Sequence, residues 1–77
     1  MNVRVLLFAG LREKAGTGEI SLELVASARV KDLREKLNLS ENEWNPLAFA
    51  VNQVYAPQDT SLKEGDEVAL IPPVAGG

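Results

Sequence analysis

The sequence contains no cysteine and no histidine among its 77 residues. These absences exclude a disulfide scaffold, a zinc or iron–sulfur site with cysteine ligands, a thiol nucleophile and an imidazole general base. Any chemistry of this chain must therefore use carboxylates, amines or the end of the chain. The aspartates and glutamates are not spaced along the chain as metal ligands would be. We therefore expect no metal site and no cofactor bound by this chain.

Basic residues and long hydrophobic runs are also scarce. Eight lysines and arginines face 11 aspartates and glutamates, for a net charge of −3. This balance disfavours a nucleic-acid partner, because phosphate binding needs clustered basic residues. No segment is long enough to cross a membrane, and Asn2 and Arg4 interrupt a start that lacks a signal-peptide pattern. We expect a cytoplasmic protein.

What is present fits one small α+β domain, with 45% hydrophobic and 25% charged residues. Apolar alternation and turn residues predict strands over 3–9, 19–24, 48–51, 54–56 and 68–71. "VKDLREKLNL", residues 30–39, is the one convincing helix, with Val30, Leu33 and Leu37 on one stripe. Residues 11–15 suggest one helical turn, and "SENEWNP" suggests a polar loop.

This order of elements predicts a mixed sheet of about four to five strands packed on one main helix, with the last strand beside the first. That is the β-grasp (ubiquitin-like) arrangement, which buries one face of each element. We expect a single domain over residues 1–77, with 72–77 as an extended tail.

The helix covers only one face of such a sheet. The other face would carry Leu6, Phe8, Ala69 and Ile71 as an exposed apolar patch, which usually marks a partner site. The alternative is that a loop, such as the one holding Trp44, folds over these residues.

The chain ends in "PPVAGG". Six residues can extend roughly 20 Å, and the two prolines favour an extended conformation. Gly76 and Gly77 lack a Cβ atom, so another protein can approach a terminal carboxylate from any side. The alternative is an ordinary disordered end.

These residues resemble a family. "LKEGDEVALIPPVAGG", with "VRVLLFAGLREKAG" and "AVNQ", is similar to the MoaD group of the ThiS/MoaD sulfur carriers, the small subunits of molybdopterin synthase. The resemblance covers nearly the whole chain. Arg29 departs from it, since a Thr often precedes the helix Val there; this concerns only helix capping.

The resemblance implies a carrier whose terminal carboxylate is adenylated by an E1-like (MoeB-like) enzyme, which binds the ATP and Mg²⁺. A sulfur donor, such as a cysteine desulfurase, would then form a thiocarboxylate. The tail would insert into the large (MoaE-like) subunit, within a heterotetramer of two small and two large subunits. The sulfur would pass to cyclic pyranopterin monophosphate. Catalytic groups would come from the large subunit.

The resemblance also assigns roles to residues of this chain. Gly77 would carry the sulfur and Gly76 would be its small neighbour. The inserted tail would be Pro72, Pro73, Val74 and Ala75. Phe8 and Ile71 match apolar interface positions. Arg12 matches an arginine near the activating enzyme, although an ordinary solvated arginine would look the same.

Three alternatives remain open from the sequence. The first is a related sulfur carrier for another pathway, such as thiazole synthesis, which shares the fold and the Gly-Gly end; the "PPVAGG" ending and the length favour the molybdopterin branch. The chain also fits a ubiquitin-like modifier, whose terminal glycine would form isopeptide bonds with lysines. The third alternative is a β-grasp interaction module whose tail has no function.

Overall fold

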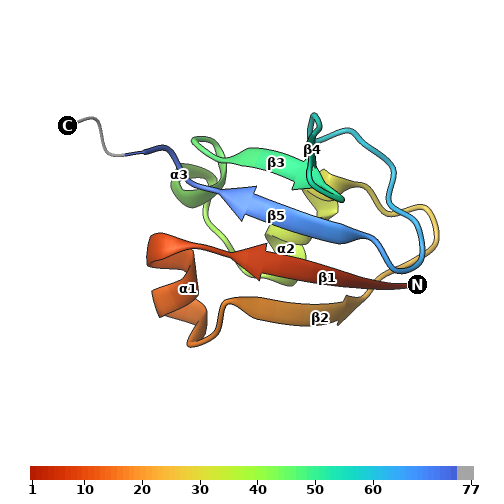
Figure 1. The fold of residues 1–77 in the computed structure, drawn as a ribbon, viewed down its shortest axis with the longest axis horizontal. Coiled ribbons are helices and arrows are strands. Elements are labelled where there is room, and N and C mark those ends of the chain that lie inside the picture. The colour runs from red at the N-terminus through yellow and green to blue at the C-terminus, as the bar shows by residue number, and fades with distance from the viewer. Residues whose placement is uncertain (75–77) are drawn as a thin grey trace.

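The computed structural model describes residues 1–74, so Ala75, Gly76 and Gly77 of the expected tail lie outside the described residues. Five strands and three short α-helices follow one another along the chain (Figure 1). In chain order they are β1 (Asn2–Leu7), α1 (Ala9–Ala15), β2 (Glu19–Glu23), the 3-10 turn η1 (Val30–Asp32), α2 (Leu33–Lys36), α3 (Glu41–Trp44), β3 (Ala48–Val51), β4 (Val54–Tyr55) and β5 (Glu67–Ile71).

The five strands form one mixed sheet in the order β2-β1-β5-β3-β4. β1 pairs in parallel with β5 and antiparallel with β2, while β3 pairs antiparallel with both β5 and β4. The last strand therefore lies beside the first, as predicted. The predicted strands all exist, with ends that differ by one or two residues.

The turn between β3 and β4 is tight and is formed by Asn52 and Gln53. Asn52 and Gln53 both have positive φ, at 51° and 70°, as the two central residues of a type I′ hairpin turn require. The Asn52 amide fixes this turn to the chain before β5: Nδ2 donates to Asp66 Oδ1 at 2.9 Å, and Oδ1 accepts from the Glu67 amide at 3.0 Å.

The helical layer differs from the single main helix that the sequence predicts. The predicted helix over 30–39 is a 3-10 turn, Val30–Asp32, followed by the four-residue α2. It starts where the Asp32 carboxylate accepts from the Arg29 amide at 2.7 Å, and it has ended by Asn38, whose φ is 55°. The predicted turn at 11–15 is instead part of the seven-residue α1.

The expected polar loop around Trp44 is also wrong, because it contains α3. This helix begins with a capping box: Ser40 Oγ accepts from the Glu43 amide at 3.2 Å, and Glu43 Oε1 accepts from the Ser40 amide at 2.9 Å. The reciprocal bonds satisfy two backbone donors, which is how so short a helix is held in place.

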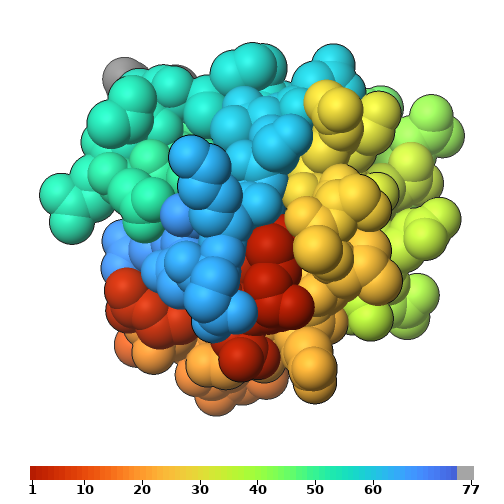
Figure 2. Space-filling view, turned by 90° about the vertical axis from the view of Figure 1, so that its right-hand side faces the viewer, coloured from red at the N-terminus to blue at the C-terminus, as the bar shows by residue number. Residues whose placement is uncertain are grey.

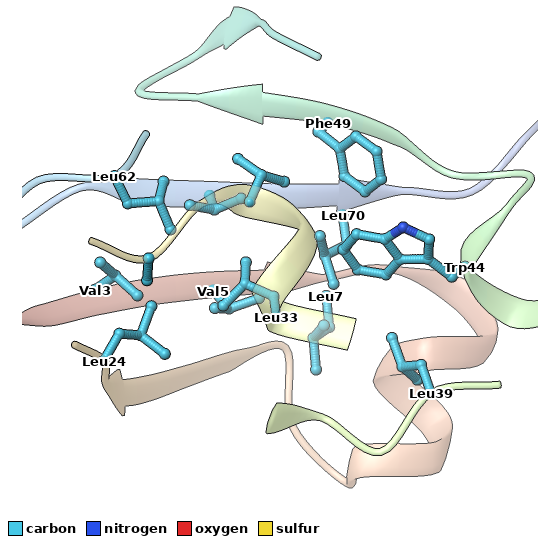
Figure 3. Close-up of a cluster of buried hydrophobic side chains, with 13 residues drawn as sticks. Val3, Val5, Leu7, Leu24, Leu33, Leu39, Trp44, Phe49, Leu62 and Leu70 are labelled. Atoms are coloured by element: carbon cyan, nitrogen blue, oxygen red, sulfur yellow. The ribbon is translucent and has the colours of Figure 1, made fainter. Parts of the chain in front are cut away.

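The core lies between the sheet and the helical layer (Figure 3). Val30 and Leu33 are fully buried, and Leu37 packs against them in part, so the predicted apolar stripe is confirmed. Their partners come from the inner face of the sheet and the segments around it. The buried hydrophobic residues there include Val3, Val5, Leu7, Leu24, Leu39, Trp44, Phe49, Leu62, Val68 and Leu70.

Trp44 belongs to this core. It is 4% exposed, its ring lies 4.7 Å from that of Phe49, and its Nε1 donates to Gln58 Oε1 at 2.9 Å. Phe49 pairs with Leu70 and shares the inner face of the sheet with it, next to the indole (Figure 3). Trp44 therefore does not cover the outer face, and that alternative is wrong for the segment that holds it.

The two ends of the sheet differ in what surrounds them. One end is built from the start of β1, the segment after β2 and the loop before β5 (Figure 2). Backbone bonds hold it together, from the Leu24 amide to Met1 O and from the Gly65 amide to Asn2 O, both at 2.7 Å. The other end carries α1, α3 and the chain leaving β5 (Figure 1).

Candidate partner-binding surface and tail

The apolar residues of the outer sheet face gather at the end where the chain leaves β5. Register places Leu6, Ala69 and Ala50 opposite one another, and Ile71 opposite Ala48. All but Ala50 are partly or fully accessible. We call Leu6, Phe8, Ala48, Ala69 and Ile71 the tail-end patch. It confirms the predicted apolar surface and adds a residue from β3.

Phe8 is the largest side chain of the tail-end patch. It lies between β1 and α1 with extended backbone angles, φ −131° and ψ 157°, so it continues the alternation of β1 onto the outer face. Phe8 is 44% exposed. Exposed large apolar side chains within a patch are typical of partner sites. Phe8 and Ile71 thus lie where a partner could contact both, although their role stays a prediction.

The other half of the outer face is polar. The Arg4 guanidinium lies between Glu67 on β5, at 3.1 Å, and Glu19 on β2, at 3.5 Å. About half of the Arg4 side chain is exposed. Such pairs contribute little to stability but keep this part of the outer face hydrated.

The tail base lines a shallow hollow at the same end of the sheet. Pro72 and Pro73 border a volume of about 330 Å³ together with Gly10 and Leu11 of α1. Glu43, Pro46 and Leu47 form the remaining wall. Val74, the last described residue, is 91% exposed. The tail therefore leaves the fold between α1 and α3, beside the tail-end patch.

An ion pair joins the two helices across this region. Lys14 Nζ lies 2.9 Å from Glu43 Oε2 and 3.0 Å from Glu43 Oε1. The backbone hydrogen bond from Ser40, followed by the Lys14 side chain, lowers the pKa of Glu43 from 4.5 to about 2. The carboxylate consequently stays charged at any physiological pH.

Arg12 lies on α1, away from any acidic partner. Its guanidinium packs against Gly18, where an added Cβ atom would come within 3.3 Å of Arg12 Cζ. Within residues 1–74, all ion pairs involve other basic side chains. The cationic group is thus held against the turn before β2, and its role towards an activating enzyme stays a prediction.

The described part of the chain offers no metal site and no helix that could cross a membrane. Residues 1–74 contain no cluster of three or more metal-ligating side chains. Their longest helix has seven residues, whereas a transmembrane helix needs about 20.

Sequence reasoning missed Glu43 in the wall of the hollow, its partners Ser40 and Lys14, and Ala48 in the tail-end patch. The spacing of Ser40 and Glu43 is a capping box and would have revealed α3. Lys14 carries no local signal, because its partner is 29 residues away. Ala48 on the outer face follows from the strand pairing alone.

The strand order and the solved structures that resemble this chain define its class: it is a ubiquitin-like, β-grasp protein. The crystal structure of small archaeal modifier protein 1 from H. volcanii matches with a TM-score of 0.82 at 25% identity, covering 95% of this chain and 98% of that one. A chain from a complex of subunits 1 and 2 of the molybdopterin-converting factor from Helicobacter pylori matches with a TM-score of 0.68 at 31% identity, over 100% of both chains.

Within this class, the chain belongs to the ThiS family, whose family model matches residues 5–77. Among curated proteins, the molybdopterin synthase sulfur carrier subunit of Chlamydomonas reinhardtii is 42% identical, with 100% of each chain covered. The predicted resemblance to the ThiS/MoaD group is thereby confirmed.

Proposed function

We propose that this protein is the sulfur carrier subunit of molybdopterin synthase. The observation that carries the proposal is the tail leaving the fold at the edge of an exposed apolar patch, in a ThiS-family chain that aligns end to end with curated sulfur carrier subunits. A carrier needs this arrangement, because one surface must hold it on a partner while the tail enters that partner's active site.

The chemistry proposed for the tail takes place at Gly77. A carboxylate is a poor electrophile, so a partner enzyme would transfer AMP from ATP to it and release pyrophosphate. A donor of a hydrosulfide equivalent would then attack the carbonyl carbon. The new C–S bond forms as AMP leaves with the electron pair of the C–O bond, and a thiocarboxylate results. Gly76 would leave room for both steps.

We assign the partners from the same surface. The large subunit of molybdopterin synthase would bind the tail-end patch, and Pro72, Pro73, Val74 and Ala75 would lead Gly77 to the acceptor, cyclic pyranopterin monophosphate. The complex of subunits 1 and 2 from Helicobacter pylori supports a partner of this kind. An E1-like adenylating enzyme would use the ATP and Mg²⁺. A cysteine desulfurase would supply the sulfur as a persulfide, from which a thiol reductant would release the hydrosulfide equivalent. The proposed location is the cytoplasm.

The test is the intact mass of the chain after incubation with ATP, a cognate adenylating enzyme and a sulfur source. We expect a gain equal to one oxygen replaced by one sulfur, located at Gly77. A variant lacking Gly76 and Gly77 is the matched control and should show no gain at an unchanged melting temperature. An unchanged mass for the parent chain, with the enzyme active on a control carrier, would refute the proposal.

A second candidate is a protein modifier, favoured by the match to a small archaeal modifier protein. The same activated carboxyl group would then form isopeptide bonds with lysines. The two functions differ in the state of the protein in its own cells. A carrier is recovered as free chain, whereas a modifier appears as a ladder of conjugates on an immunoblot.

A further inference from the structure

α1 is held loosely against the rest of the fold. None of its seven residues is buried, and Leu11 is the one that packs partly against the core. A cavity of about 160 Å³ lies beneath the helix, lined by Leu7, Leu11, Lys14 and Ile20 among others. Hydrophobic packing alone therefore fixes the orientation of this helix weakly, since a void removes contact atoms on one side.

The Lys14–Glu43 ion pair is the polar connection between α1 and α3. Both carboxylate oxygens contact Lys14 Nζ, at 2.9 and 3.0 Å. The carboxylate is already oriented, because Glu43 Oε1 also accepts from the Ser40 amide at 2.9 Å. A preoriented partner reduces the entropy that Lys14 must lose to form a fixed contact.

This ion pair adds little to the stability of the fold. The side chains of Lys14 and Glu43 are 52% and 33% exposed, and exposed pairs are screened by solvent. Its effect is on geometry. α1 begins directly after Phe8, carries Arg12, and forms with Glu43 the wall of the hollow that Pro72 borders.

We propose that the Lys14–Glu43 ion pair is a positioning element that orients α1 against α3, and thereby sets Phe8, Arg12 and the tail base in the arrangement that the partner enzymes bind. This inference rests on the proposed carrier function for its consequence, but not for the structural effect itself. Lys14 and Glu43 act through the residues that they position and take no part in the reaction.

The test compares two equally exposed lysines, each of which forms one ion pair. Lys14→Met removes the charge and keeps most of the stem, while leaving the Ser40–Glu43 cap intact. Lys31→Met is the matched control, because Lys31 is equally exposed at 52% and pairs with Asp59 at 3.2 Å. Lys31 does not line the hollow at the tail base.

The activity readout is the steady-state kinetics of adenylation, with the carrier as the varied substrate. We expect Lys14→Met to raise KM about threefold to tenfold at an unchanged kcat, because docking is impaired and the reacting group is intact. Lys31→Met should stay within about twofold of the parent chain. Lys14→Arg keeps the positive charge, so its KM should lie close to that of the parent chain. All three variants should melt within about 4 °C of the parent.

The structural readout is the set of amide chemical shifts and hydrogen-exchange rates of α1. Lys14→Met should move the shifts of residues 9–16 and speed their exchange, whereas Lys31→Met should leave them unchanged. Equal KM values for the two methionine variants would overturn the docking consequence. An unperturbed α1 in Lys14→Met would overturn the positioning role. If the parent chain is not adenylated at all, the carrier function fails, and the amide readout still decides whether the ion pair orients α1.

Discussion

Replacing Phe8 by alanine should weaken binding to the large subunit of molybdopterin synthase while leaving the domain folded. Phe8 is 44% exposed in the free chain. A phenylalanine side chain offers 150–250 Å² in total, so about 90 Å² stays available to a partner. Burying that area contributes about 2 kcal/mol, and its loss should raise Kd about thirtyfold.

The effect of Phe8→Ala on stability should be smaller than that of a core substitution. The buried part is slightly more than half of the side chain, about 110 Å², so we expect a loss of about 2–3 kcal/mol in the free energy of unfolding. Truncating a fully buried phenylalanine costs about 3–5 kcal/mol. Urea denaturation monitored by circular dichroism distinguishes the two.

Titration calorimetry with the purified large subunit measures the binding effect. Val25→Ala is the control, because Val25 is 71% exposed and lies in the segment after β2, outside the tail-end patch. It should leave Kd within about twofold of the parent value. An unchanged Kd for Phe8→Ala, or an equal loss for Val25→Ala, would show that the tail-end patch is not the binding surface. A stability loss above about 4 kcal/mol would place Phe8 in the core.

Three further predictions concern the fold and its charges. Leu33→Ala should reduce the free energy of unfolding by about 2–5 kcal/mol in a urea titration, because Leu33 is fully buried; a loss below about 1 kcal/mol would contradict the assigned core. Asn52→Gly keeps the positive φ but removes the hydrogen bonds of the Asn52 side chain to Asp66 and Glu67. It should therefore lower the free energy of unfolding by about 1–3 kcal/mol in the same assay; an unchanged midpoint would show that the turn needs only its backbone angles. The pKa of Glu43 is lower in the folded chain than in the unfolded chain, so as the pH falls the unfolded chain takes up a proton at Glu43 first. The ionised carboxylate therefore stabilises the fold fully above about pH 4.5, and this stabilisation is lost between pH 4.5 and about 2. Glu43→Gln should therefore flatten the fall of the melting temperature across that range, and parallel curves would refute the assignment.

The strands of this protein are largely decided by local sequence. Residues 19–24 alternate glutamate or serine with isoleucine or leucine. Only an extended strand places all of these apolar side chains on one buried face, so the sequence predicts β2 directly. The tight turn between β3 and β4 is equally local, because two successive residues of positive φ select few residue types. The strand order then follows from the need to cover one sheet face with the helical layer.

The helices were harder to predict, because the longest within residues 1–74 has seven residues and α2 and α3 have four each. The four-residue α3 spans one turn and is held by its capping box rather than by an apolar stripe. Trp44, at its end, could have faced either side of the sheet on sequence grounds, and its packing on Phe49 placed it inside.

By itself, the sequence determined the strands and the apolar stripe on Val30 and Leu33, because both follow from the spacing of neighbouring residues. It also determined the family, because the motifs that the family shares run along most of the chain. Only the tertiary structure decided that the outer face stays open at the tail end and that Lys14 meets Glu43. Both depend on segments far apart in the chain, and a contact across 29 residues leaves no periodic trace in either segment.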